Sequence, residues 1–139
     1  MALIEWNESL RLGIAVVDRQ HEGLVGIINR LHVATLDGRG TDIIGETMDE
    51  LIIYTATHFS TEEKYFAQFE YPHAEEHKRE HDALIARVSA LADDFNRAER
   101  SSRSALTKEL LQFLQIWWQY HMMDTDSKFV ALFKEKGLT

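Results

Sequence analysis

Hydrophobic side chains recur at spacings of three and four residues in four successive stretches of the chain, which is the period of an amphipathic helix. In the first two stretches the inward rows are His21, Leu24, Ile28 and Leu31, then Ile44, Met48, Leu51, Thr55, His58, Glu62, Tyr65 and Phe69. In the last two they are His77, His81, Leu84, Val88, Leu91 and Phe95, then Leu106, Leu110, Phe113, Trp117 and His121. The pattern predicts four helices that share one core.

Turn-forming residues separate these stretches at 37–40, at Tyr71-Pro72, which holds the only proline, and at 100–104. We expect helices at about 19–37, 42–70, 74–99 and 103–135. The expected N-caps are Asp18 for the first helix, Thr41 or Asp42 for the second, and Ser102 or Ser104 for the fourth. Short connections favour antiparallel neighbours. The fold class is therefore all-α, an up-down-up-down antiparallel four-helix bundle, as a single domain over 1–139 with an extended N-terminal arm at 1–18.

The last helix changes phase partway along its length. Its second half has its apolar row on Met122, Asp126, Phe129 and Phe133, one residue out of step with the row that ends at His121. A helix accommodates such a shift by a local π-type bulge or by a change in its winding.

Composition and charge narrow the function classes. The residues are 45% hydrophobic and 27% charged, as in a globular protein, and the net charge of −8 without a basic cluster argues against nucleic-acid binding. No apolar run approaches the roughly 18 residues of a membrane span. The acidic Glu5 and Glu8 near the start do not resemble a secretory signal, so we expect a cytoplasmic monomer. The absence of cysteine excludes disulfides, thiolate zinc sites and iron–sulfur clusters.

The inward rows contain an unusual number of ionisable residues for a bundle core, where an unpartnered charge is costly. They are His21, His58, Glu62, His77, His81, His121 and Asp126. A single core histidine is more often hydrogen-bonded than metal-bound, and the His77–His81 pair alone could lie partly in solvent. Seven such residues on four faces that must meet indicate a metal site with nitrogen and oxygen ligands. His32 and His73 lie off these rows.

Counting bonds indicates two metal ions and one open position. Five histidines supply five bonds, two bridging carboxylates supply four, and a bridging solvent oxygen supplies two, against the twelve that two octahedral ions need. Histidine-rich ligation suits iron, although imidazole also binds zinc, copper and nickel. Glu70-x-x-His73 spells a motif of ferritin-like di-iron proteins, but it spans Pro72 and cannot lie on one continuous helical face.

The segments Asp18-Arg19-Gln20-His21 and His58-Phe59-Ser60-Thr61-Glu62, together with Trp6 in the arm, resemble the hemerythrin family and its bacterial single-domain members. The resemblance implies two iron ions that alternate between Fe²⁺ and Fe³⁺ with a bridging oxo or hydroxo ligand. It implies that His77, His81 and His121 bind one iron, that His21 and His58 bind the other, which keeps the vacancy, and that Glu62 and Asp126 bridge. It further implies reversible binding of dioxygen, and of small anions such as azide in the oxidised form.

Two residues depart from the usual family pattern. Trp118 stands where many relatives carry leucine, and Met122 where they usually carry isoleucine. With Trp117, these residues are expected to line the dioxygen pocket, which would then be narrower. The alternative is that Trp118 only fills the core against a neighbouring helix.

We therefore expect a dioxygen-binding protein for storage, delivery or sensing rather than an enzyme. The alternatives are a di-iron peroxidase or nitric-oxide-handling enzyme at the same vacancy, an iron-handling protein, or a structural zinc site. No general acid is evident beside the site, because Tyr54 and Tyr65 are expected to pack against the bundle.

Overall fold

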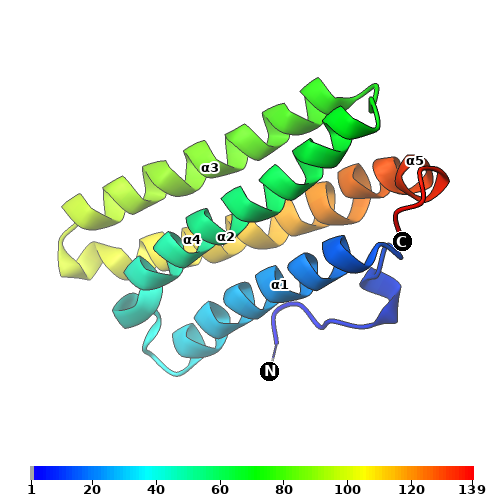
Figure 1. The fold of residues 1–139 in the computed structure, drawn as a ribbon. Coiled ribbons are helices and arrows are strands. Elements are labelled where there is room, and N and C mark those ends of the chain that lie inside the picture. The colour runs from blue at the N-terminus through cyan, green and yellow to red at the C-terminus, as the bar shows by residue number, and fades with distance from the viewer. Residues whose placement is uncertain (1) are drawn as a thin grey trace.

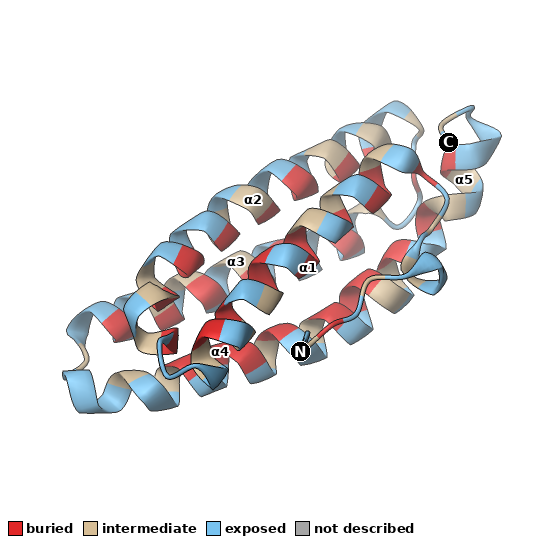
Figure 2. Ribbon diagram, turned by 90° about the horizontal axis from the view of Figure 1, so that it is seen from below, coloured by how far each residue is buried: buried red, intermediate tan, exposed pale blue. Residues whose placement is uncertain are grey.

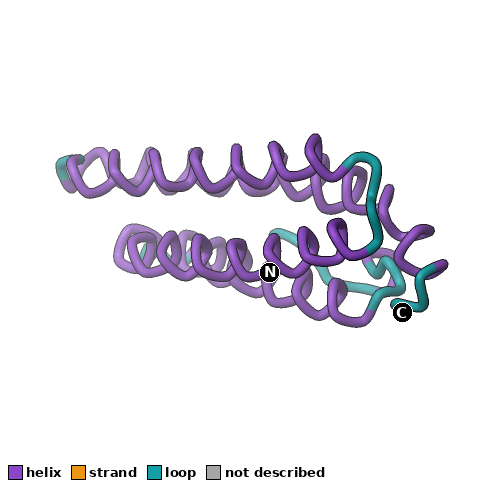
Figure 3. Tube along the Cα trace, turned by 45° about the horizontal axis from the view of Figure 1, so that its top comes forward, coloured by secondary structure: helices purple, strands orange, loops and turns teal. Residues whose placement is uncertain are grey.

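The computed structural model describes residues 2–139 and confirms the all-α class and the four-helix bundle (Figure 1). The long helices are α1 (Ala15–Leu36), α2 (Gly40–Gln68), α3 (Ala74–Arg97) and α4 (Arg103–Trp117). The last rod continues through a π-helix (Trp118–Thr125), a 3₁₀-helix (Asp126–Phe129) and α5 (Val130–Glu135). Short connections join the long helices (Figure 3), including a second 3₁₀-helix at Arg100–Ser102. Consecutive helices pack side by side, and α4 also contacts α1, which closes the bundle.

The N-terminal arm, which contains a 3₁₀-helix at Glu8–Leu10, is tied to α1 by Asn29. The Asn29 side chain accepts hydrogen bonds from the backbone N–H groups of Leu3 and Ile4, both at 3.0 Å, and donates to the carbonyl of Ile4 at 2.8 Å. Ile4 is thereby held in the core. Met1, the first residue of the predicted arm, lies outside the described residues.

Two of the predicted helix starts are wrong. Asp18 is not the N-cap of α1 but lies within its first turn, because its carboxylate accepts the backbone N–H groups of Leu12 at 2.7 Å and Gly13 at 3.0 Å. The chain is therefore already helical at Ala15. Helix α2 begins at Gly40 rather than at a Thr41 or Asp42 cap, and glycine at this position permits a close approach to Thr35, where a Cβ atom would collide.

Buried residues line the inner faces of all four long helices (Figure 2). In the last rod the buried row runs through Leu114 and Trp118, whereas the predicted Phe113 and Trp117 are only half-buried. In α2, Phe66 is buried where Tyr65 and Phe69 were predicted. Leu114, Trp118 and Phe66 each follow a predicted residue by one position, a shift that a broad helical face permits.

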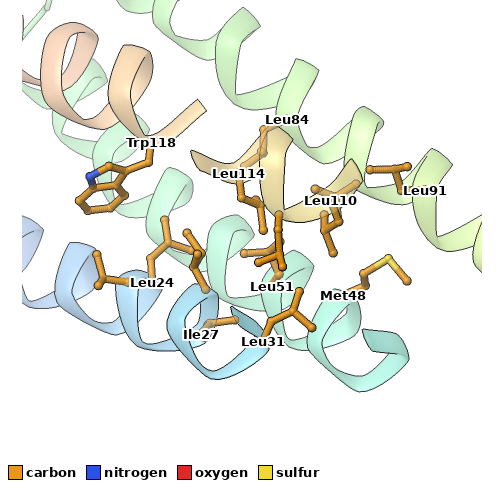
Figure 4. Packing of buried hydrophobic residues seen from close by; sticks show 14 of the residues in the cluster. Leu24, Ile27, Leu31, Met48, Leu51, Leu84, Leu91, Leu110, Leu114 and Trp118 are labelled. Carbon is orange, nitrogen blue, oxygen red and sulfur yellow. The ribbon is translucent and has the colours of Figure 1, made fainter. Parts of the chain in front are cut away.

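The apolar core is divided into two clusters. The larger one fills the bundle from Ile4 and Leu24 to Phe95 and includes the aliphatic side chains in Figure 4. The smaller one lies near the C-terminal end of the last rod and consists of Ile14, Val17, Phe66, Tyr71, Phe129 and Phe133. Along each rod, the predicted ligands lie between residues of these two clusters. No helix among residues 2–139 has the length and apolarity that a membrane crossing requires.

Candidate metal centre

The structure brings the seven predicted ligands together in one layer, each at most 2% exposed. Their ligand atoms form two overlapping groups, and within each group all of them lie within 4.8 Å of one another. The larger group is Glu62, His77, His81, His121 and Asp126, and the smaller is His21, His58, Glu62 and Asp126. Both carboxylates belong to both groups. This arrangement fits two ions that share two carboxylates and differ by one histidine.

Local helix geometry aims these side chains inward. His58 and Glu62 on α2, like His77 and His81 on α3, are four residues apart and therefore share a helical face. His121 and Asp126 are five apart, and in an α-helix they would point about 140° from each other. The π-helix solves this, because the Asp126 N–H donates to the His121 carbonyl and closes the wider turn. The bulge predicted from the phase shift is thus confirmed, and it joins two of the candidate ligands directly.

The buried polar atoms of this layer do not satisfy one another. Histidine Nε2 atoms lie near carboxylate oxygens, as at 2.8 Å for His77 to Asp126, 3.0 Å for His21 to Asp126 and 3.1 Å for His81 to Glu62. Even so, Nε2 of all five histidines and both oxygens of each carboxylate lack a well-aligned hydrogen bond. The atoms point to common spaces rather than at each other. Buried polar groups are normally satisfied, so this layer fits bound cations.

The charges in the layer also favour ligation. Burial, reinforced by the neighbouring His21, lowers the pKa of His58 to about 3. Burial, reinforced by His121, lowers the pKa of His81 to about 2. Both imidazoles are therefore neutral at neutral pH, as a metal ligand must be. Burial and then Asp126 raise the pKa of Glu62 well above its usual range, because two carboxylates here lack enough positive charge between them.

His77 and Asp126 shift in the opposite sense. Burial alone would lower the pKa of His77, but the carboxylates of Asp126 and Glu62 raise it to about 9. Burial alone would raise the pKa of Asp126, but His121 and the other facing histidines hold it well below its usual range. Without a cation, a histidine proton supplies the positive charge that the two carboxylates require.

Three polar residues outside the predicted set contact the far side of the histidine rings. Gln20 lies against Nδ1 of His58, Glu63 against Nδ1 of His81, and Glu80 near Nδ1 of His121. Each is adjacent in sequence to a candidate ligand, at His21, Glu62 and His81 respectively. This adjacency was the available signal in the sequence, but it does not identify the contacted rings, because each ring lies on a different helix from its polar partner.

The three residues expected around the dioxygen pocket, Trp117, Trp118 and Met122, have different surroundings in the structure. Trp118 is buried, and its ring lies 5.7 Å from that of His21 in the smaller group. Trp117 instead stacks on His121 of the larger group, with ring centroids 4.8 Å apart and planes 10° apart. Trp117 therefore lies beside the three-histidine group, because consecutive residues diverge around the helix, and its place in a dioxygen pocket stays a prediction. Met122 is fully buried in the larger apolar cluster.

The two histidines left out of the predicted set stay outside the layer. His32 is half-buried on α1, and His73 is exposed at the start of α3. Glu70 is exposed in the turn before Pro72, where its φ of 54° interrupts the helix. Glu70 and His73 therefore contribute to neither ligand group.

Comparison with known proteins agrees with this geometry. The family model described as the hemerythrin HHE cation binding domain matches residues 12–133. The bacteriohemerythrin of Stenotrophomonas maltophilia is 33% identical over 93% of this chain and 80% of its own length. That of Pseudomonas aeruginosa is 34% identical over 94% and 81%. A crystal structure of wild-type hemerythrin superposes with a TM-score of 0.79 at 27% identity, covering 94% of this chain and 98% of the other. The match spans both ligand groups and nearly the whole bundle, and the chain therefore belongs to the hemerythrin family.

Proposed function

We propose that this protein holds two iron ions in the buried layer and binds dioxygen reversibly at one of them. The observation that carries the proposal is the inequality of the two ligand groups. The larger group offers three histidines and two carboxylates, and the smaller offers two histidines and the same carboxylates. With one solvent oxygen shared between the ions, a six-coordinate ion fits the larger group and a five-coordinate ion fits the smaller. The open position belongs to the ion held by His21 and His58.

The choice of iron rests on the donor atoms. Five imidazoles and two carboxylates, with no thiolate in the chain, form a site that suits a redox-active ion of intermediate softness. When bound as ferrous ions, the two irons supply dioxygen with one electron each and recover both electrons on release. The layer also offsets most of the charge, because two Fe²⁺ ions bring +4 against −2 from Glu62 and Asp126 and −1 from a shared hydroxide, which leaves +1.

The residues around the smaller group favour an uncharged diatomic ligand. Trp118 brings apolar surface to this side of the layer, with its ring 5.7 Å from that of His21, and we expect Met122, buried in the same apolar cluster, to add to it. Such surroundings disfavour water, protons and solute anions, which would displace reduced dioxygen before it could leave as O₂. His58 contributes a neutral ring that stays neutral over a wide pH range, because burial depresses its pKa to about 3.

The placement of the neighbouring tyrosines favours reversible binding of dioxygen over peroxidase chemistry, because a peroxidase needs a proton donor beside the vacancy. The Tyr54 hydroxyl is engaged with the backbone carbonyl of Gln20 at 2.8 Å. Tyr65 stacks on Phe69, with ring centroids 5.6 Å apart, on the side of the smaller apolar cluster. Neither hydroxyl is placed as a free donor to the histidines of the smaller group.

The test is metal analysis combined with optical spectra of anaerobically reduced protein before and after exposure to air. We expect two irons per chain without haem, and a colour change on oxygenation that reverses under vacuum. The oxidised form should bind azide at the iron held by His21 and His58. Zinc as the dominant metal, one metal per chain under iron-replete expression, or azide at the three-histidine iron would contradict the proposal.

A further inference from the structure

The outer nitrogens of the candidate histidine ligands have unequal partners. In the smaller group, Nδ1 of His58 lies 2.6 Å from the amide oxygen of Gln20. In the larger group, Nδ1 of His81 lies 2.8 Å from a carboxylate oxygen of Glu63. The Glu80 carboxylate adds a longer contact of 3.5 Å to Nδ1 of His121. The partner is thus neutral beside the two-histidine group and anionic beside the three-histidine group.

The neutral partner is fixed in its orientation. The Gln20 amide nitrogen donates to the Thr61 hydroxyl at 3.1 Å, which leaves the amide oxygen facing His58. The backbone carbonyl of Gln20 accepts a hydrogen bond from the Tyr54 hydroxyl at 2.8 Å. Tyr54 reaches this position because residue 23 is glycine, where a Cβ atom would collide with its hydroxyl. Four residues therefore cooperate to present an uncharged acceptor to His58.

The two carboxylates differ in how closely they approach their histidines and in how far they are exposed to solvent. Glu63 makes the shorter contact, and its side chain is 29% exposed. Glu80 is 44% exposed, and the Thr125 hydroxyl donates to the same oxygen of Glu80 at 3.1 Å. The Nδ1 atoms of His21 and His77 lack a partner among the described residues. Glu63 is accordingly the main source of negative charge behind the larger group.

We propose that Glu63, with a smaller contribution from Glu80, makes the three-histidine iron the easier of the two to oxidise, and that Gln20 keeps the two-histidine iron harder to oxidise. A carboxylate that accepts the outer N–H of an imidazole increases the basicity of the ring and stabilises the higher charge of Fe³⁺. A neutral amide does so less. Glu63, Glu80 and Gln20 are positioning residues that act through the histidines. The inference rests on the proposed di-iron function.

The asymmetry has a use for a dioxygen carrier. The three-histidine ion has no open position, so its electron is available only if the protein stabilises its oxidised state. Three neutral imidazoles alone would favour the ferrous state at this ion, and the negative charge of Glu63 counteracts that preference. The ion with the vacancy, backed by Gln20, then stays ferrous until dioxygen arrives.

The test compares the iron-loaded full chain with E63Q in an anaerobic redox titration that resolves both one-electron steps. We expect the lower potential to rise, with about a tenfold weaker preference for Fe³⁺, which corresponds to about 59 mV for one electron. The gap between the two steps should narrow. E80Q should act in the same direction but less, Q20E should lower the higher potential, and E63D should restore most of the gap. E46Q is the matched control, because Glu46 is an exposed carboxylate about 25 Å earlier along the same helix.

A second readout does not depend on iron. In the Zn²⁺-loaded protein, the Nδ1–H proton of His81 should resonate farther downfield than that of His58, and E63Q should shift it upfield without moving the His58 signal. Two irons per chain with an unchanged gap in E63Q and E80Q would overturn this inference and leave the proposed function intact. Failure of the wild type to hold two irons would overturn the proposed function, and with it the inference.

Discussion

Trp118 is the residue whose replacement says most about the tuning of this protein. Its indole lies at the end of the larger apolar cluster (Figure 4), edge-on to His21 at 5.7 Å between ring centroids. It is only 5% exposed, so a smaller side chain at this position would leave space beside His21. We expect Trp118→Leu to speed both the association of dioxygen and autoxidation several-fold, because the smaller side chain admits dioxygen, water and anions alike.

The cost in stability follows from the burial. A buried aromatic side chain covers about 150–250 Å², worth about 4–6 kcal/mol at 25 cal/mol per Å², and a leucine retains about 1.5–3 kcal/mol. The difference, together with incomplete collapse of the cavity, is about 2–4 kcal/mol of unfolding free energy. Iron content should remain at two per chain, since no candidate ligand is removed.

The assay is stopped-flow mixing of the ferrous protein with dioxygen, followed by the slow decay of the oxygenated spectrum. Trp117→Leu is the matched control, because Trp117 is the adjacent tryptophan but stacks on His121 on the three-histidine side. It should leave the association rate of dioxygen unchanged. Wild-type rates in Trp118→Leu, alongside the expected destabilisation, would mean that Trp118 only fills the core.

Three further predictions concern the charge and the backbone of the bundle. Glu62→Ala should lose more iron than His21→Ala, because the shared carboxylate belongs to both ligand groups. Its unfolding free energy should fall by about 3–5 kcal/mol relative to the wild type. Equal iron contents and equal melting temperatures in the two variants would refute this ranking. In the metal-free protein, His58 and His81 have folded-state pKa values of about 3 and 2, so the unfolded chain binds their two protons at a higher pH than the folded chain does. His77, with a pKa of about 9, and Glu62, with a raised pKa, act in the opposite sense near neutral pH, because they hold protons in the folded state that the unfolded chain has lost. Urea titrations should therefore show little change in stability between pH 7 and 6 and a fall between pH 5 and 4 toward a slope of about 2.7 kcal/mol per pH unit; stability that rises from pH 5 to 4 would contradict those shifts. Glu70→Gly should raise the unfolding free energy by about 0.5–1 kcal/mol, since Glu70 adopts a φ of 54°, and a lower midpoint in thermal unfolding would count against it.

The helices and the ligand set could be predicted because both depend on local periodicity. Inward rows at spacings of three and four place His58 with Glu62, and His77 with His81, without knowledge of the tertiary structure. The pair His121 and Asp126 breaks that period, and the break indicated a π-type bulge or a change in winding, of which the structure shows the π-helix. Resemblance to the family then supplied the division of these residues between two ions.

Other features depend on contacts that periodicity does not report. Asp18 was predicted as an N-cap, but it lies in the first turn of α1, which starts at Ala15. From there its carboxylate accepts the backbone N–H groups of Leu12 and Gly13, which precede the helix. Trp117 and Trp118 are adjacent in sequence, and only the helix phase places one against His121 and the other against His21. Glu63 lies off the inward row of α2, so periodicity assigns it to solvent, and only the packing of α3 against α2 brings His81 beside it.

The division of the core has a consequence for how the protein unfolds. The ligand layer lies between two apolar clusters, and the smaller of them contains residues from the first turn of α1, the end of α2 and the end of the last rod. Metal bound by these residues would join all four rods across this layer, so both clusters should then unfold together in a single cooperative step. Without metal, the buried polar atoms of the layer lack well-aligned hydrogen bonds, and we expect the smaller cluster to become a separate unfolding unit. Amide hydrogen exchange of the chelator-treated protein should then be fast around Phe129 and Phe133 and slow around Leu51 and Leu84, so that metal sets the cooperativity of the bundle as well as its stability.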